Sequence, residues 1–276
     1  MQEESSTLPV VLAIGGHDPC GGAGIQADIE AIAANGAHAA TIVTCLTVQD
    51  SCNVLALHPV AAETISAQAV AIFQDAHISA IKIGLLGSPG ATEAVIRILR
   101  SHPKIPVILD PVLAAGGGNR LAGEQILRLM CEELLPLCDL ITPNTHEARH
   151  LSNKSESATM EECARHLLAF GAGSVLITGT HDALTNPEIT HRLFIPDESA
   201  VTSTCQRLPG EYHGSGCTLA SAIAAHLAHQ EPLQTAIEQA LDYSWKSLRH
   251  GFRIGRCQSL PDRLFRLTRQ PSMPNE

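Results

Sequence analysis

The sequence predicts an α/β fold in which helices cover both faces of a mostly parallel sheet, with an antiparallel hairpin at one edge. Short β-branched runs alternate with Ala- and Leu-rich stretches of helical length, which is typical of βα units. Near residue 190 the alternation gives way to two strand-like segments joined by turn residues. The 276 residues are 45% hydrophobic, which is enough for a large core. We therefore expect a three-layer α/β/α sandwich.

The elements follow in chain order. The expected strands are Val10–Ile14, Thr41–Leu46, Ala80–Ile83, Val107–Leu109, Leu140–Thr142 and Val175–Thr178. The expected helices are Gly24–Ala34, Ala61–Gln74, Ala91–Leu99, Gln125–Glu133, Met160–Phe170, Thr218–Ala228 and Leu233–Leu248. The edge hairpin pairs Thr190–Ile195 with Ala200–Cys205 across a turn that contains Pro196.

No composition break or linker divides the chain, so we expect a single domain over residues 1–276. Its ordered core should run from about residue 10 to 265, followed by a tail at 266–276. The segment from Asp262 onward mixes arginines with prolines. We expect it to be loosely attached, with Arg263, Arg266 and Arg269 facing solvent or a partner subunit.

The composition argues against several classes of protein. The 18 Lys and Arg residues against 28 Asp and Glu residues give a net charge of −10, which opposes binding to nucleic acid. No apolar run approaches the roughly 20 residues of a membrane span, and the start of the chain lacks a basic leader. We therefore expect a cytoplasmic protein. Nine scattered cysteines without a C-x-x-C pair disfavour a zinc site or a disulfide framework.

A glycine-rich segment from Gly15 to Asp28 follows the first strand and leads into a helix. Glycines let the backbone approach a ligand, and the helix start offers free N–H groups. A dinucleotide fingerprint at Gly22 to Ala27 would come too late after the strand, and a plain connection without ligand is the other alternative. The carboxylates of Asp18 and Asp28 favour a polar ligand instead.

A second glycine-flanked segment, Gly214-Ser215-Gly216-Cys217, precedes an Ala-rich helix. Successive N–H groups at a helix start form a cradle for anionic oxygens such as those of a phosphoryl group. The helix dipole would favour the thiolate of Cys217, which makes it the thiol with a local reason to be reactive. The alternative is a small buried hydrophobic residue at a helix start.

Two carboxylates follow expected strands, Asp110 in Asp110-Pro111-Val112 and Glu147 in Thr142-Pro143-Asn144-x-x-Glu147. Ligands of open parallel sheets bind beyond the carboxyl ends of the strands, where both residues would emerge. Two hard oxygen ligands beside an anion hole suit Mg²⁺ held partly through water. A capping box over Asn144 to Glu147 is the alternative. No Walker A lysine motif is present, so a P-loop nucleotide site is excluded.

Taken in order, these motifs resemble those of the hydroxymethylpyrimidine/phosphomethylpyrimidine kinase family, a thiamine-pathway branch of the ribokinase-like superfamily. The resemblance covers about Val10 to Phe265. Its most specific parts are Gly16 to Asp28 and His213 to Thr218. Between them lie Leu46–Gln49, Lys82–Leu85, Asp110–Val112 and Thr142–Glu147. The resemblance implies a ribokinase-like fold.

It also implies roles at the matching positions. The substrate pocket would consist of Gln49 on the aminopyrimidine edge, Asp28, the backbone near Gly16 and Ala23, and the apolar side chains of Leu85 and Val112. Cys217 would remove the proton of the substrate hydroxymethyl group, and the N–H groups of Gly214, Ser215 and Gly216 would neutralise the transferring phosphoryl group.

On the nucleotide side, Asn144 and Glu147 match an N-x-x-E element that organises Mg²⁺ near the ATP phosphates, with Asp110 close by. Thr178 and Gly179 would adjoin the phosphates. The chain departs from the family here, because Thr178 stands where relatives often carry lysine, and Leu241 stands where a second lysine can reach ATP. The pyrimidine side therefore matches the family better than the ATP side.

The expected activity is an ATP- and Mg²⁺-dependent phosphorylation of 4-amino-5-hydroxymethyl-2-methylpyrimidine and then of its monophosphate, in thiamine diphosphate biosynthesis. A pyridoxal or pyridoxine kinase is one alternative. Gln49 favours the pyrimidine, because a carboxamide can both donate to a ring nitrogen and accept from an amine. A non-catalytic pyrimidine sensor is the alternative from another class. The resemblance further implies a homodimer built through the edge hairpin.

Overall fold

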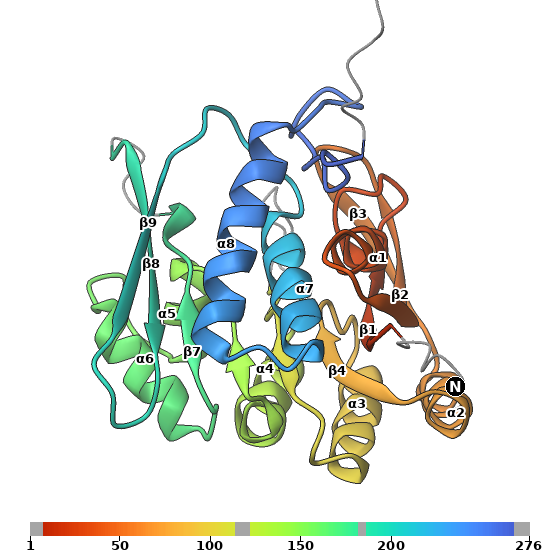
Figure 1. Ribbon diagram of the computed structural model, residues 1–276. Coiled ribbons are helices and arrows are strands. Elements are labelled where there is room, and N and C mark those ends of the chain that lie inside the picture. Colours follow the sequence, from red (N-terminus) through yellow and green to blue (C-terminus); the bar gives the residue numbers. More distant parts are fainter. Residues whose placement is uncertain (1–7, 114–121, 182–185, 268–276) are drawn as a thin grey trace, which may run out of the picture.

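A computed structural model describes residues 8–113, 122–181 and 186–267. In this part of the chain, one nine-stranded sheet has the order β3-β2-β1-β4-β5-β6-β7-β8-β9, and helices cover both of its faces (Figure 1). The strands are β1 (Val10–His17), β2 (His38–Gln49), β3 (Val54–Pro59), β4 (Ile78–Ile83), β5 (Val107–Leu109), β6 (Leu140–Ile141), β7 (Val175–Ile177), β8 (Glu188–Phe194) and β9 (Val201–Gln206). The predicted three-layer α/β/α sandwich is confirmed.

The helices alternate with these strands. They are α1 (Gly24–Ala34), α2 (Ala62–Asp75), α3 (Pro89–Ser101), α4 (Glu124–Leu129), α5 (Thr145–Leu151), α6 (Met160–Ala169), α7 (Ser215–Ala228) and α8 (Leu233–Arg249). Three further helical turns are η1 (Met130–Leu134), η2 (Leu135–Leu137) and η3 (Gly179–His181). Within the described ranges, no helix is long and apolar enough to cross a membrane.

Strand β1 shows why the sheet needs helices on both faces. Leu12 and Ile14 join the core beneath α2 to α6, whereas Val11 and Ala13 join the core beneath α1, α7 and α8. Alternate side chains of a strand point to opposite faces, so an uninterrupted apolar strand must be covered twice. The Ala-rich α7 lies between α1 and α8 against the middle of the sheet (Figure 1).

The parallel strands end at one edge, which positions the site described below. From β2 to β7 in the order of the sheet, each strand pairs in parallel with the next. The antiparallel hairpin of β8 and β9 is confirmed at one edge. The opposite edge differs from the prediction, because β3 also pairs antiparallel with β2. The segment Val54–Pro59 is only six residues long, and none of them is buried although the first four are apolar.

Candidate active site

The start of α7 offers an uncapped anion site. Gly214 has a φ of +82°, and no side chain caps this helix start. A Cβ at Gly214 would overlap the carbonyl oxygen of Gly22, so only glycine allows the two loops to approach this closely. The N–H groups of the first turn, from Ser215 to Cys217, lack intrahelical acceptors and can bind anionic oxygens.

Cys217 lies in the first turn of α7, but it is not a free thiolate. Its side chain is only 8% exposed. Burial raises the pKa of Cys217, and the carboxylates of Asp110 and Asp28 add to this effect. The nearby ammonium of Lys82 and a hydrogen bond from the N–H of Gly24 oppose the shift without reversing it. Burial therefore opposes the thiolate that the helix dipole would favour, and the catalytic role of Cys217 stays a prediction.

A buried ion pair lies behind Cys217. Lys82 in β4 is 1% exposed, and its Nζ donates to Asp28 Oδ1 at 2.7 Å. Ser221 on α7 donates to the same oxygen at 2.7 Å. Burial alone would lower the pKa of Lys82, but the neighbouring carboxylates outweigh it and keep the ammonium charged. Asp28 is fully buried and its carboxylate holds Lys82 inside the fold, so a contact of Asp28 with substrate stays a prediction.

The sequence analysis assigned no role to Lys82. The signal was present, because a single lysine interrupts the otherwise apolar strand Ile78–Ile83. Buried lysines need a carboxylate partner. The lysine indicates that a buried carboxylate exists but not which one, because Asp28 is 54 residues away in the sequence.

Asp110 and Glu147 follow β5 and β6, and the charge of Asp110 acts on Glu147. Burial raises the pKa of Asp110, although Lys82 and Cys217 lower it. Burial and the charge of Asp110 raise the pKa of Glu147 to about 8, against hydrogen bonds from the N–H groups of Asn144 and Leu113. Two carboxyl groups that disfavour each other's charge are suited to sharing a cation. Asp110 Oδ2 is buried without a protein partner, which fits such a role.

Asn144 is the N-cap of α5. Its Oδ1 accepts from the N–H groups of His146 and Glu147 at 2.9 Å, while Glu147 Oε2 accepts from the Asn144 N–H. The capping box left open as an alternative therefore exists, and it fixes the Glu147 carboxylate. Asn144 also forms a parallel bridge to Thr178, directly before Gly179. These residues lie together, whereas Leu241 packs against the core beneath α8.

The residues expected around the pyrimidine have the following neighbours in the structure. A Cβ at Gly16 would lie 3.0 Å from Cys45 Sγ and 3.1 Å from Leu85, so Gly16 and Leu85 adjoin. The N–H of Ala23 donates to Asp18 Oδ2 at 2.8 Å and is therefore occupied. Gln49, at the end of β2, contacts His213 at 3.3 Å. Val112 follows Asp110, and its N–H donates to the Asp110 carbonyl oxygen at 2.9 Å.

Arg263 is the clearest correction to the sequence analysis. It is 2% exposed, although we expected it to face solvent or a partner. Its guanidinium donates to the carbonyl oxygens of Gly21 and Gly22 and, at 2.8 Å, to Thr218 Oγ1. Thr218 in turn donates to the Gly214 carbonyl oxygen at 2.8 Å. Arg263 therefore joins the glycine-rich loop to the anion site, and Arg269 lies outside the described residues.

The cysteines also differ from the expectation. Cys52, in the turn between β2 and β3, forms a disulfide with Cys257. The pair joins this turn to the loop that follows α8. The two cysteines are 205 residues apart in sequence, so no local spacing pattern could have indicated the bond.

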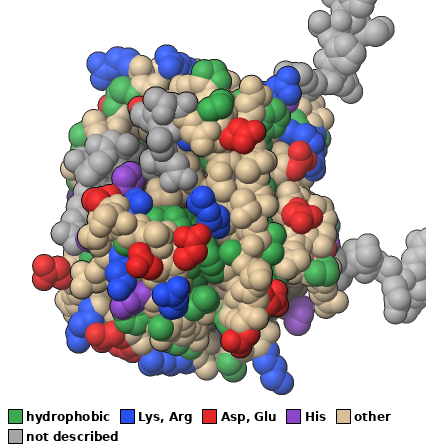
Figure 2. Space-filling model, turned by 90° about the vertical axis from the view of Figure 1, so that its left-hand side faces the viewer, with side chains coloured by type: hydrophobic (Ala, Val, Ile, Leu, Met, Phe, Trp, Pro, Cys, Tyr) green, Lys and Arg blue, Asp and Glu red, His purple; other side chains and the backbone are tan. Residues whose placement is uncertain are grey.

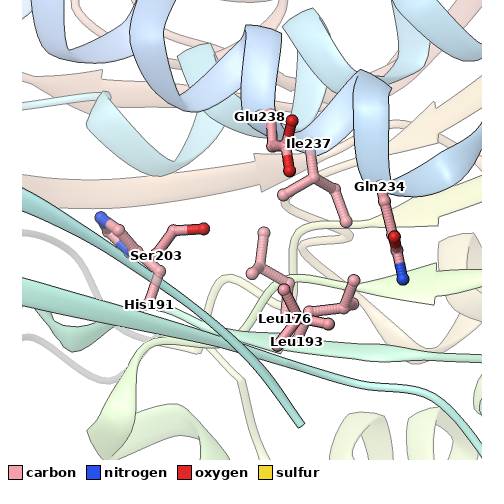
Figure 3. Close-up of a pocket in the computed structure, with 8 residues that line it drawn as sticks. Leu176, His191, Leu193, Ser203, Gln234, Ile237 and Glu238 are labelled. Atoms are coloured by element: carbon pink, nitrogen blue, oxygen red, sulfur yellow. The ribbon is translucent and has the colours of Figure 1, made fainter. Parts of the chain in front are cut away.

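A small cavity lies away from these residues. It is formed between α8 and the strands β7, β8 and β9, and its polar lining side chains are those of His191, Ser203, Gln234 and Glu238 (Figure 3). Its volume of about 10 Å³ admits one water molecule. It is therefore too small for a substrate. In the described part of the chain, no three His, Cys, Asp or Glu residues are grouped to hold a metal ion.

Comparisons with known proteins identify the family of the chain. A profile of the phosphomethylpyrimidine kinase family matches residues 18–261. The chain belongs to the phosphomethylpyrimidine kinase family. A hydroxymethylpyrimidine/phosphomethylpyrimidine kinase of Haemophilus influenzae is 35% identical over 254 residues, covering 91% of this chain and 94% of that protein. The resemblance inferred from the motifs is confirmed, and this family consists of phosphotransferases.

Solved structures give the same result for the fold. Bacillus subtilis pyridoxal kinase in complex with ADP is 27% identical, with a TM-score of 0.87 over 95% of this chain and all of that one. A phosphomethylpyrimidine kinase of Clostridium difficile is also 27% identical, with a TM-score of 0.74 over 87% of this chain and 99% of that one. Members of the phosphomethylpyrimidine kinase family and pyridoxal kinases therefore share this ribokinase-like fold.

Proposed function

We propose that this member of the phosphomethylpyrimidine kinase family phosphorylates 4-amino-5-hydroxymethyl-2-methylpyrimidine and then its monophosphate, using ATP, in thiamine diphosphate biosynthesis. One observation carries the proposal beyond family membership. Cys217 lies in the uncapped first turn of α7, and the charges of Asp110 and of the buried ammonium of Lys82 both act on its pKa. A thiol that can pass its proton to a carboxylate thus adjoins the N–H groups of a helix start, as phosphorylation of an alcohol requires.

The proton transfer involves more than the thiol. Cys217 donates a hydrogen bond to Asp110, which lowers the pKa of that carboxyl group. When the substrate hydroxyl gives its proton to Cys217 Sγ, the thiol proton can pass to Asp110, so that no isolated thiolate needs to exist inside the fold. The charge of Lys82 favours the negative form of this pair. The N–H groups of Gly214 to Cys217 bind the transferring phosphoryl group.

The other half of the site fits Mg²⁺ and the phosphates of ATP. Glu147 and Asp110 provide hard oxygen atoms, and Asp110 Oδ2 has no protein partner. They would hold Mg²⁺ partly through water, where the ion would neutralise charge on the phosphates. Asn144 orients Glu147 through the capping box, and the bridge from Asn144 to Thr178 brings Gly179 close to this position.

The test is a mass measurement of the product after incubation of the protein with hydroxymethylpyrimidine, ATP and Mg²⁺. A gain of one and then two phosphoryl groups supports the proposal. Binding of the pyrimidine without ATP consumption contradicts it and supports the pyrimidine sensor. Omitting Mg²⁺ is the control, and it should abolish both additions.

A pyridoxal kinase is the second candidate, because the Bacillus subtilis pyridoxal kinase has the same fold over 95% of this chain. The pyrimidine remains favoured by the family profile and by Gln49, whose carboxamide can donate to a ring nitrogen and accept from an exocyclic amine. A comparison of kcat/KM for hydroxymethylpyrimidine and pyridoxal decides between them. We expect a higher value for the pyrimidine.

The homodimer also remains a proposal, and the structure favours a different surface for it. Acidic and basic side chains are interspersed on the side of the molecule where β8 and β9 lie (Figure 2). Large exposed apolar side chains occur on the β2–β3 hairpin instead, at Leu46, Val48 and Leu55, which is 71% exposed. Such side chains mark interaction surfaces. Light scattering of the Leu55→Lys variant should show loss of a dimer if this hairpin forms the interface.

A further inference from the structure

Asp18, His213 and Gln49 form a chain of contacts between the glycine-rich loop, the anion site and the end of β2. Asp18 is 2% exposed. Its Oδ1 accepts from the Cys20 N–H at 2.8 Å, and its Oδ2 accepts from the Ala23 N–H at 2.8 Å. His213 Nε2 lies 2.9 Å from the same Oδ2. The carboxylate of Asp18 therefore faces three donor positions.

Asp18 decides which nitrogen of His213 carries a proton. Burial would raise the pKa of Asp18, but the hydrogen bonds from His213, Ala23 and Cys20 outweigh it and hold the pKa below its usual range. An ionised carboxylate only accepts hydrogen bonds. A lone pair on His213 Nε2 would face this negative charge, so Nε2 must carry the proton and donate it.

The protonated Nε2 in turn decides the orientation of the Gln49 carboxamide. Gln49 Nε2 lies 3.3 Å from His213 Nε2, and two N–H groups that face each other cannot form a hydrogen bond. A half-turn of the carboxamide exchanges its oxygen and nitrogen positions. Turned this way, the carboxamide oxygen is a second acceptor that shares the single Nε2 proton with Asp18 Oδ2. The amide NH₂ then points away from His213, where no hydrogen-bond partner is found for it among the described residues.

We propose that Asp18, acting through His213, fixes the Gln49 carboxamide so that it presents an N–H donor to the substrate ring. This selects a ring with an acceptor nitrogen beside its exocyclic group. Asp18 and His213 are thus positioning residues for substrate specificity. The inference rests on the proposed function, in which Gln49 binds the ring. It adds that the site discriminates between the 4-amino ring, whose N3 is an acceptor, and the 4-oxo ring, whose N3 carries a proton.

The experiment compares kcat/KM for 4-amino-5-hydroxymethyl-2-methylpyrimidine and its 4-oxo analogue. The wild-type protein should prefer the amino ring. In Asp18→Asn and His213→Gln, the partner of Gln49 can donate or accept, so the carboxamide is free to turn. The preference should fall about tenfold, because one hydrogen bond no longer discriminates. Most of the change should appear in KM, since Cys217 itself is unchanged in both variants.

Asp50→Asn is the matched control, because it makes the same chemical change next to Gln49. Asp50 Oδ1 accepts only from turn N–H groups, those of Cys52 and Asn53. In the Asp50→Asn variant, the ratio of kcat/KM for the amino ring to that for the oxo ring should equal the wild-type ratio. Gln49→Glu removes the donor and should reverse the preference towards the oxo ring. His213→Gln keeps the loop hydrogen bonds of Asp18, so it stays informative if Asp18→Asn unfolds the loop.

The outcomes separate this inference from the proposed function. If Asp18→Asn and His213→Gln both fold and keep the wild-type ratio of kcat/KM for the amino ring to that for the oxo ring, the positioning role of Asp18 and His213 is overturned. The kinase activity itself would be unaffected by this outcome. Failure of the wild-type protein to phosphorylate the amino ring would instead overturn the proposed function. Calorimetric binding of both rings in the absence of ATP gives a second measurement of the ratio. A fall of the preference for the amino ring in both the kinetic and the calorimetric measurement supports the positioning role of Asp18 and His213.

Discussion

The two halves of the site are held together by different forces. The substrate half comprises the glycine-rich loop, the end of β2 and the start of α7. It is fixed by buried charged groups, among them Lys82, Asp28 and Arg263. The nucleotide half comprises the start of α5, β6, β7 and η3. It is fixed by a capping box at Asn144 and by a backbone bridge to Thr178. A change in the substrate half should therefore remove charge compensation, which costs more than a lost cap.

The largest expected effect is that of Cys217→Ala on the first phosphorylation. An alcohol needs a base, so its turnover should fall by about 10²- to 10⁴-fold. The monophosphate is already ionised, and its phosphorylation should fall far less. Single-turnover rates for the two substrates measure this. Cys217→Asp restores a proton acceptor and is the companion variant. Equal losses in both steps would mean that Cys217 positions the phosphoryl group.

Lys82→Met should give the largest loss of stability. It leaves Asp28 buried without its cation, which typically costs about 3–5 kcal/mol. Urea unfolding monitored by circular dichroism measures the loss. The double variant Asp28→Asn with Lys82→Met removes both charges and should recover much of it. Lys246→Met is the control, because its ion pair with Asp242 is about half exposed and contributes little. An unchanged free energy of unfolding in Lys82→Met would show that the buried charges are not coupled.

Removal of the Cys52–Cys257 disulfide tests the substrate half at its outer boundary. The bond closes a loop across 205 residues, and its loss should lower the free energy of unfolding by roughly 3 kcal/mol. The N–H of Gln258 donates to the Ser51 carbonyl oxygen, so the disulfide also supports the end of the hairpin that carries Gln49.

The double variant Cys52→Ser with Cys257→Ser should therefore raise the KM for the pyrimidine more than the KM for ATP. Treatment of the wild-type protein with dithiothreitol should reproduce both effects, and the same treatment should not change the double variant. A reductant effect of equal size in both proteins would assign it to other thiols.

The sequence predicted those parts of the fold that depend on local pattern. Short apolar strands and Ala-rich helices can be recognised from their periodicity. The glycines before Cys217 likewise indicate a loop that leads into a helix. The partners of Asp28 and Arg263 depend on contacts across 54 and up to 242 residues. No local pattern carries that information. A buried carboxylate and a solvent-facing one look the same in a sequence, so the charge state of Cys217 could be judged only once its neighbours were known.

The smallest effect is expected beside the nucleotide half, at His191 in β8. This side chain is 7% exposed, its Nδ1 has no partner, and it faces the small cavity shared with Glu238 (Figure 3). Burial lowers the pKa of His191 from 6.5 to about 4. The unfolded chain therefore binds a proton that the folded protein does not, and stability falls as the pH drops below about 6.5.

The loss from His191 should reach about 2 kcal/mol at pH 5 relative to pH 7.5. Urea unfolding of wild type and His191→Leu over this pH range measures it, and the variant should lose less stability on acidification. His58→Gln, at an exposed position in β3, is the control and should follow the wild type. Parallel pH curves for His191→Leu and wild type would mean that the hairpin takes up the proton without unfolding. The β8–β9 hairpin would then accept a buried charge that the substrate half has to balance with an ion pair.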